Sequence, residues 1–203
     1  IRAMGVAIDR YIVSRVVDRI IVADEINAGR AGKLYNKPIS IIPYGIDIDV
    51  FNSGAEEESN AFRQKYKVSD GEFLISQVGI ISPQKNQIES VRALKSLIKK
   101  GIPAKLIIAG HEEPSYKKFL VRYIADNGLE ENVIFTGMVD KKEVAGIYKI
   151  SDACLFPVKE YGGWLAPFEA LCSARPVIVS SSMGASGLLK KHDFCMISND
   201  FPS

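Results

Sequence analysis

Short apolar runs alternate with helical patterns along almost the whole chain of 203 residues. Seven runs read as strands: RIIVA (19–23), ISIIPY (39–44), FLISQVG (73–79), AKLIIAG (104–110), NVIFTG (132–137), ACLFP (153–157) and PVIVS (176–180). Most of them are apolar at consecutive positions rather than at every second one, which is typical of strands covered on both faces. They predict a parallel sheet.

Helical patterns fill the segments between these runs. The segment 86–101 carries apolar residues at helical spacing and ends on glycine, while 115–128 and 140–150 begin with serine and aspartate caps. Alternation of this kind predicts βαβ units with right-handed crossovers. The expected fold class is therefore α/β, a Rossmann-like parallel sheet flanked by helices.

Two regions are expected along the chain. Residues 39–203 form the Rossmann-like domain, truncated at its C-terminal end, with a linker near 46–52 and a lead-in helix near 57–66. Residues 1–38 hold a helix, a strand and a second helix. These either complete the sheet or form the end of a preceding N-terminal domain.

Composition excludes several classes of protein. The chain has 26 basic and 24 acidic residues and no basic run with interleaved aromatics, so no nucleic-acid partner is expected. No apolar run approaches the roughly 20 residues that span a bilayer. Cys154, Cys172 and Cys195 are odd in number and lack metal-ligand spacing, which indicates free thiols in a reducing, cytoplasmic compartment.

Ligands of open parallel sheets bind beyond the carboxyl ends of the strands, so the loops there are the candidate site. Neither a G-x-G-x-x-G nor a P-loop motif occurs. The loop after Val78 places Gly79 at a strand end and Lys85 near the next helix, where a lysine can reach an anion held at the helix N-terminus. A solvated lysine on a long loop is an equally good interpretation.

The stretch EYGGWLAPFEALCSARPVIVS (160–180) is the second candidate loop. Gly162 and Gly163 can expose backbone N–H groups to a phosphate, or they can simply form a turn. Trp164 reads as a packing anchor rather than a stacking platform. Pro167 suits a first helical position, and Glu169 then lies in the first turn, where an acid also favours the helix dipole. The expected buried stripe of this helix is Phe168, Leu171 and Cys172.

Two further features carry weaker signals. The segment SSSMGASG (180–187) is small and polar and is interpreted as a surface turn, although it could also touch phosphate. His111 lies at a strand end and His192 in a charged KKHD segment, and neither belongs to a nucleophile–base set.

In their order, these segments resemble the C-terminal, donor-binding domain of a GT-B glycosyltransferase of family 4. The resemblance runs from about residue 18 to residue 193. The similar segments are IIPYGIDIDVF (41–51), VGIISPQKNQ (78–87), LIIAG (106–110), ENVIFTG (131–137), IYKISDACLFP (147–157) and GGWLAPFEALCSARPVIVS (162–180). The resemblance implies a retaining hexosyltransferase that uses a nucleotide-diphosphate sugar and requires no metal or other cofactor.

The resemblance also implies roles for particular residues. Glu169, which matches the acid ending the family's E-x7-E motif, would bind the ribose hydroxyls, and Lys85 would neutralise the diphosphate. Backbone N–H groups would reach the diphosphate from four consecutive positions: Gly162, Gly163, Trp164 and Leu165. The nucleoside base would lie near Gly137 and Met138.

Two positions depart from the family pattern. After the strand glycine, Gly79, the family arginine is replaced by Ile80, which removes one cation from the diphosphate site. The position eight before Glu169 holds Tyr161 instead of glutamate, while Glu160 lies one residue earlier. Either Glu160 or Tyr161 is therefore expected to contact the donor sugar, as catalytic candidates beside Lys85.

The expected partners are a nucleotide-sugar donor and a sugar or lipid-linked acceptor, the acceptor held together with a missing N-terminal domain. The full-length protein is expected at the cytoplasmic face of a membrane if it associates with one peripherally. The alternative function is a catalytically silent sugar-nucleotide-binding or interaction domain of the same fold, which the two departures favour.

Overall fold

The computed structural model describes residues 10–52, 56–159, 165–184, 186–190 and 193–198. By its internal contacts the chain divides into two compact units, Ile1–Gly45 and Ile46–Ser203. The division falls later than the boundary after residue 38 that the sequence predicts.

The first unit contains a small parallel sheet. A helical segment at 10–16 precedes strand β1 (Ile20–Val22), helix α2 (Glu25–Leu34) and strand β2 (Ile39–Ile41). Asp24 caps α2, since its Oδ1 accepts a hydrogen bond of 2.6 Å from the backbone N–H of Asn27. Strand β2 pairs with β1 and does not join the larger sheet. Whether residues 1–38 end a preceding domain stays a prediction.

The second unit is built on a parallel six-stranded sheet with the order β5-β4-β3-β6-β7-β8. Its strands are β3 (Phe73–Val78), β4 (Ala104–Ala109), β5 (Val133–Gly137), β6 (Ala153–Phe156), β7 (Val177–Ser180) and β8 (Cys195–Ser198). Counted from β3 as the first strand, this is the 3-2-1-4-5-6 order of dinucleotide-binding folds. The predicted Rossmann-like class is confirmed.

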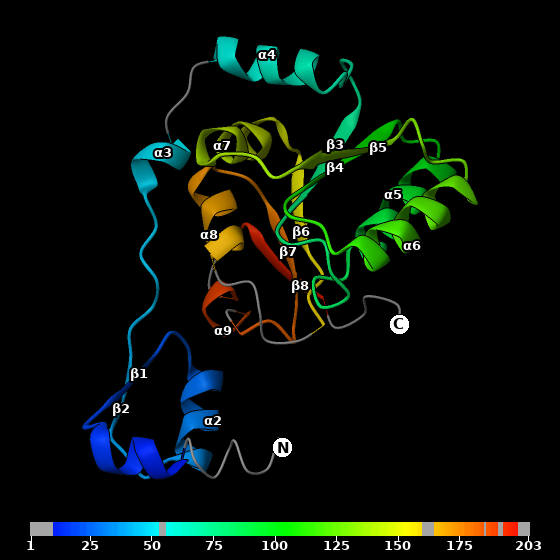
Figure 1. Cartoon of the computed structure of the whole chain (residues 1–203). Coiled ribbons are helices and arrows are strands. Elements are labelled where there is room, and N and C mark those ends of the chain that lie inside the picture. Colours follow the sequence, from blue (N-terminus) through cyan, green and yellow to red (C-terminus); the bar gives the residue numbers. More distant parts are fainter. Residues whose placement is uncertain (1–9, 53–55, 160–164, 185, 191–192, 199–203) are drawn as a thin grey trace. The chain divides into compact units, whose positions relative to one another are not determined.

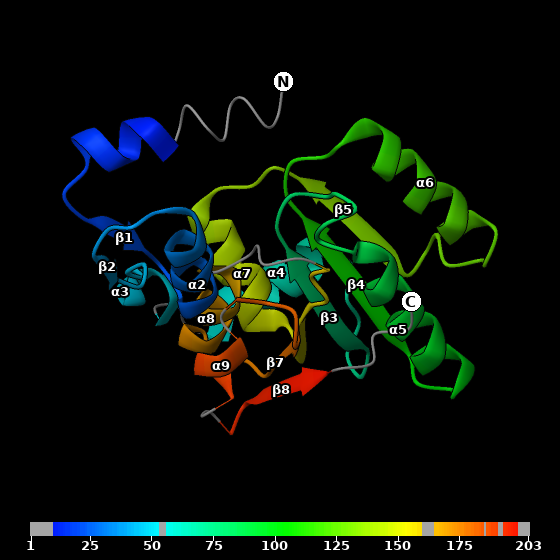
Figure 2. The same cartoon turned by 90° about the horizontal axis from the view of Figure 1, so that it is seen from below.

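Helices cover both faces of the sheet (Figures 1 and 2). One face packs on α5 (Gln87–Lys99) and α6 (Pro114–Ala125). The other face packs on five helices: α3 (Ile48–Asn52), α4 (Glu56–Lys65), α7 (Lys141–Ile150), α8 (Leu165–Cys172) and α9 (Ser186–Leu189). Along β4, Leu106 and Ile108 belong to the first core, while Ile107 and Ala109 belong to a core on the opposite face. The consecutive apolar pattern therefore has the predicted cause.

Three elements differ from the sequence-based expectations. The predicted linker at 46–52 contains α3, which contacts α7 and α8 and buries Phe51 completely, with its ring centroid 6.2 Å from that of Tyr148. Helix α8 begins at Leu165, not Pro167, and buries Pro167 and Ala170. The three residues of its predicted stripe, Phe168, Leu171 and Cys172, pack against the core but are only half-buried. Strand β8 was not predicted.

Candidate functional site

The strand order reverses direction between β3 and β6, which are paired neighbours in the sheet. Crossovers on either side of such a point run in opposite directions, so a crevice opens at the carboxyl ends of the two strands. Both candidate loops of the sequence start there, one after Val78 and one after Phe156. The backbone N–H of Lys159 donates a 2.9 Å hydrogen bond to the carbonyl of Gln84, which joins the two loops.

Glycines terminate the three strands on one side of this point. Gly79 donates its N–H to Ala109 and Gly110 donates to Gly137, both at 2.8 Å. Gly110 has φ +144°, and a Cβ built on it would lie 2.1 Å from the carbonyl oxygen of Gly79. Only glycine allows these two strand ends to approach so closely. Gly110 was not among the predicted site residues, although the run LIIAG ends on it.

Lys85 lies in the turn just before α5, where its backbone carbonyl accepts a 2.8 Å hydrogen bond from Gln77 Nε2. A Cβ built on Gly79 would lie 3.9 Å from Lys85 Cε, so the lysine side chain runs beside that strand end. Burial lowers the pKa of the Lys85 ammonium group. Among the residues that the structure describes, this group forms no ion pair. A half-buried cation without a carboxylate partner favours an anionic ligand.

Glu169 is the fifth residue of α8 and not in its first turn, so the helix-dipole interpretation is wrong for this acid. Its side chain is half-buried. Burial raises the pKa of the Glu169 carboxyl, and the charge of Lys141 lowers it. The side chain of Tyr148 is fully buried in the core beside α8. Burial raises the pKa of its hydroxyl, and the nearby Cys154 and Glu169 raise it further.

The other predicted donor-binding residues are mostly exposed. Ile80, Met138 and Leu165 are 50%, 81% and 39% exposed, and Gly137 ends β5 with φ +69°. The apolar side chain of Ile80 carries no charge, so it cannot replace the arginine that the resemblance implies at this position. Glu160, Tyr161, Gly162, Gly163 and Trp164 lie outside the described residues. The predicted roles of all these residues, like those of Lys85 and Glu169, stay predictions.

Lys141 is a cation near Glu169 that the sequence did not single out. It is the first residue of α7, beyond the carboxyl end of β5, and its Nζ lies 3.4 Å from Asp47 Oδ2. Its charge lowers the pKa of Glu169. In the sequence it is one of two adjacent lysines after an aspartate cap, and nothing distinguishes it from Lys142.

Replacing Lys141 with alanine is therefore expected to raise the pKa of Glu169 further, because the carboxylate loses a neighbouring positive charge. Carbon-detected NMR titration of the glutamate carboxyls measures this pKa directly. Lys142→Ala is the matched control, since it removes an exposed lysine from the same helix. An unchanged Glu169 pKa in Lys141→Ala would contradict the placement of the two side chains.

The serines at the end of β7 and just after it have a structural role. The hydroxyls of Ser180 and Ser182 both donate 2.6 Å hydrogen bonds to the carbonyl of Val158, so they tie the loop after β7 to the loop after β6. His111 is exposed, and His192 lies outside the described residues. In the described part of the chain, no group of three or more His, Cys, Asp or Glu residues could hold a metal ion. Nor does that part contain a helix of the length and apolarity that crossing a membrane requires.

A family model described as "Glycosyl transferases group 1" matches residues 58–200, which is more than half of the chain. The chain belongs to this family. An uncharacterized glycosyltransferase of Methanocaldococcus jannaschii is 30% identical to this chain over 157 residues, covering 77% of the chain and 38% of the relative. The alpha-monoglucosyldiacylglycerol synthase of Streptococcus pneumoniae is 28% identical over 156 residues, covering 76% of the chain and 35% of the relative.

The fold of this chain is similar to that of the Anabaena protein HepE, solved in complex with UDP and glucose. The TM-score is 0.85 at 18% sequence identity, and the match covers 99% of this chain and 54% of HepE. The solved structures that this chain resembles in fold, HepE among them, include GT-B glycosyltransferases, so the predicted GT-B half-domain is confirmed. The chain spans less than half the length of the two curated relatives.

Proposed function

We propose that Ile46–Ser203 is the donor-binding half of a retaining, family-4-like glycosyltransferase that transfers a sugar from a nucleoside diphosphate. The observation that carries this proposal is where Lys85 and α8 lie. Lys85 is in the loop after β3 and α8 follows the loop after β6, and the strand order of the sheet reverses between these two strands. Membership in the group 1 family supports the transferase activity. The UDP and glucose bound to HepE support a nucleotide-sugar donor.

In this proposal the donor lies across the carboxyl ends of β3, β5 and β6. Lys85 neutralises the diphosphate, and the backbone N–H groups of residues 162–165 cradle it. Glu169 accepts hydrogen bonds from the ribose hydroxyls, and the base lies near Gly137 and Met138. The leaving diphosphate is stabilised by fixed protein charges, with no metal or other cofactor.

Glu160 or Tyr161 contacts the donor sugar in this proposal, beside Lys85. The acceptor is a sugar or a lipid-linked sugar held together with a further domain, since the chain spans under half of its curated relatives. The diacylglycerol in the name of the Streptococcus pneumoniae relative supports a lipid acceptor. For the full-length protein we further propose action at the cytoplasmic face of a membrane.

A catalytically silent sugar-nucleotide-binding domain is the second candidate function. The exposed Ile80, at the position of the family arginine, favours it, because loss of one cation at a diphosphate costs about 2–4 kcal/mol of transition-state stabilisation. A radiolabelled-donor assay on the full-length protein separates the two functions. Sugar transfer supports the enzyme, and nucleotide binding without transfer supports the silent domain.

Glu169→Gln is expected to weaken binding of a nucleoside diphosphate sugar by about 1–3 kcal/mol, because the ribose hydroxyls lose a charged acceptor. Isothermal titration calorimetry of the chain with UDP-glucose and GDP-mannose measures the change. Glu130→Gln is the matched control, since Glu130 is exposed beyond the C-terminus of α6. Equal affinity for wild type and Glu169→Gln would remove Glu169 from the donor site.

A further inference from the structure

The loop between β3 and α5, residues 79–86, carries Lys85 and is called the lysine loop below. Its backbone forms a turn in which the N–H groups of Lys85 and Asn86 donate to the carbonyl of Ser82, at 3.0 and 3.1 Å. Asn86 closes the turn with φ +57°, directly before α5. Loops that bind ligands usually belong to the less stable parts of a protein, so a loop with a fixed shape needs further contacts.

Two buried glutamines hold the lysine loop, one near each end. Gln87 opens α5, where its Nε2 donates a 2.9 Å hydrogen bond to the carbonyl of Ile80 and its Oε1 accepts a 3.3 Å hydrogen bond from the N–H of Ser82. Gln77, in β3, donates from Nε2 to the carbonyl of Lys85 at 2.8 Å. Their side chains are 0% and 2% exposed. The loop is therefore fixed by the strand before it and by the helix after it.

The amide of Gln77 is itself oriented by α5. Gln77 lies two residues after Ile75 in β3, so both point to the face of the sheet on which α5 packs (Figure 2). There the fully buried hydroxyl of Ser90 donates a 2.6 Å hydrogen bond to Gln77 Oε1. Apolar groups of the same shape in place of both partners of a buried hydrogen bond can be nearly neutral for stability. Stability alone therefore does not account for a glutamine and a serine at these two positions.

These contacts hold both backbone groups of Lys85, its N–H through Ser82 and its carbonyl through Gln77. The direction in which the lysine side chain leaves the backbone is thereby fixed. The side chain runs beside the end of β3, since a Cβ built on Gly79 would lie 3.9 Å from Lys85 Cε. A long side chain that is ordered in advance loses less conformational entropy when it binds an anion.

We propose that Gln77 is a positioning residue, whose amide, oriented by Ser90, holds Lys85 in place beside Gly79. The inference rests on the proposed function in one respect, because there Lys85 meets the diphosphate of the donor. Gln77 is too deeply buried to contact the donor itself and acts only through Lys85.

Calorimetric titration of the chain with UDP tests this role. Gln77→Met keeps the length of the side chain but removes the amide, and it is expected to weaken UDP binding about threefold to tenfold. In a Lys85→Ala background the same substitution should have no further effect on the affinity. Ser90→Ala is the milder second variant, because it removes only the hydroxyl that orients the amide, and it should weaken binding by a smaller factor.

Asn132→Leu is the matched control. The Asn132 amide donates a 3.0 Å hydrogen bond to the carbonyl of Ala104, at the amino end of β4 and therefore at the opposite edge of the sheet. This variant also loses a hydrogen-bonded amide, so it should lower the melting temperature as Gln77→Met does, but leave the affinity for UDP unchanged. An equal loss of affinity in the two variants would overturn the proposal, because it would reduce the role of Gln77 to general stability.

The pKa of Lys85, measured by NMR of the lysine ε-carbons, tests the position of the side chain without UDP. Burial lowers this pKa, so release of the loop in Gln77→Met or Ser90→Ala should raise it toward its ordinary value. An unchanged Lys85 pKa in both variants would overturn the proposal. So would an undiminished UDP affinity in Gln77→Met, or a further loss in the Lys85→Ala background, where Lys85→Ala itself weakens binding. If Lys85→Ala leaves the affinity unchanged, the proposed diphosphate site is wrong, and the Lys85 pKa alone decides whether Gln77 positions this lysine.

Discussion

Lys85→Ala is expected to weaken binding of UDP tenfold or more, the equivalent of about 1.5–3 kcal/mol for a hydrogen bond to a charged group. The ammonium group is half-buried beside Gly79 and has no ion-pair partner in the described part of the chain. A diphosphate would supply that partner. Because burial lowers the Lys85 pKa, the affinity should also fall as the pH rises through this lowered pKa and the ammonium group loses its proton.

The matched control for this prediction is Lys99→Ala. Lys99 is the last residue of α5, at the opposite end of the helix from Lys85, and it is exposed. Both variants change the net charge by the same amount, so a general electrostatic effect on UDP would appear in both. Calorimetric titration that gives the two variants the same affinity would exclude Lys85 from the diphosphate site.

Gly110→Ala is expected to destabilise the second unit by about 3 kcal/mol or more. The new Cβ would lie 2.1 Å from the Gly79 carbonyl oxygen, and it would have to be accommodated at φ +144°. Neither backbone can move without breaking the hydrogen bonds that hold Gly79 to Ala109 and Gly110 to Gly137. For a unit of this size the loss corresponds to a fall in melting temperature of about 6–12 °C.

Gly101→Ala separates the two causes of this loss. Gly101 also has a positive φ, +77°, but a Cβ built on it would meet no heavy atom within 4 Å. It should therefore cost only the backbone strain, about 1–2 kcal/mol, and melt above Gly110→Ala. Equal melting temperatures for the two variants would show that the strand ends are not in the close contact described above.

The sequence was sufficient to predict the fold because the central strands of the large sheet are buried on both faces. In β4 four consecutive apolar residues, Leu106–Ala109, divide between two cores, and no other arrangement of a strand buries such a run. The positions of Lys85 and of the loop after β6 followed from the same pattern, since the carboxyl ends of parallel strands meet at one edge.

The features that were missed depend on contacts between distant segments. Strand β8 is an edge strand with Met196 64% exposed, so it lacks the continuous burial of Leu106–Ala109 in β4 and of all four residues of β6. Phe168 and Leu171 pack against the core but stay half-buried, while Pro167 and Ala170 of α8 are buried, a difference that spacing alone does not predict. Lys141 and Gly110 gain their importance from Glu169 and Gly79, which are far from them in the sequence.

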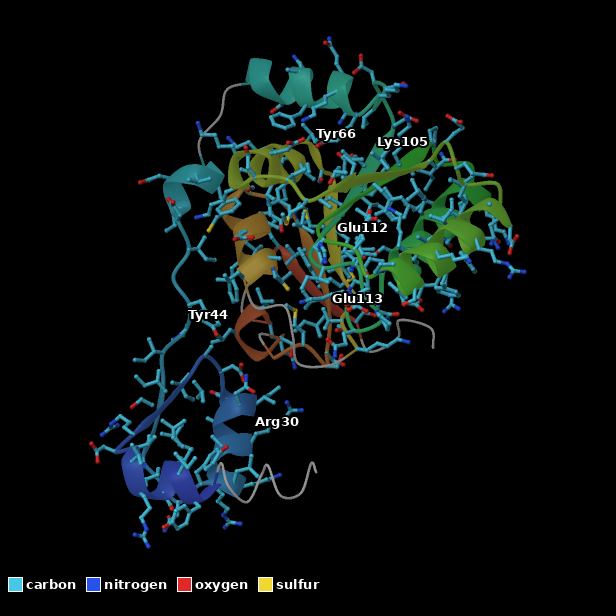
Figure 3. All side chains as sticks on the ribbon, viewed as in Figure 1. Arg30, Tyr44, Tyr66, Lys105, Glu112 and Glu113 are labelled. Carbon is cyan, nitrogen blue, oxygen red and sulfur yellow. The ribbon has the colours of Figure 1, made fainter. Side chains whose placement is uncertain are left out.

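Figure 3 shows the side chains of the described residues on the ribbon, in the view of Figure 1. A crystal structure of the chain grown with UDP tests the central claim most directly. The account predicts electron density for the diphosphate beside Lys85, at the carboxyl ends of β3 and β6, with the ribose hydroxyls within hydrogen-bond distance of Glu169. UDP bound at any other edge of the sheet, or with its ribose away from Glu169, would contradict it.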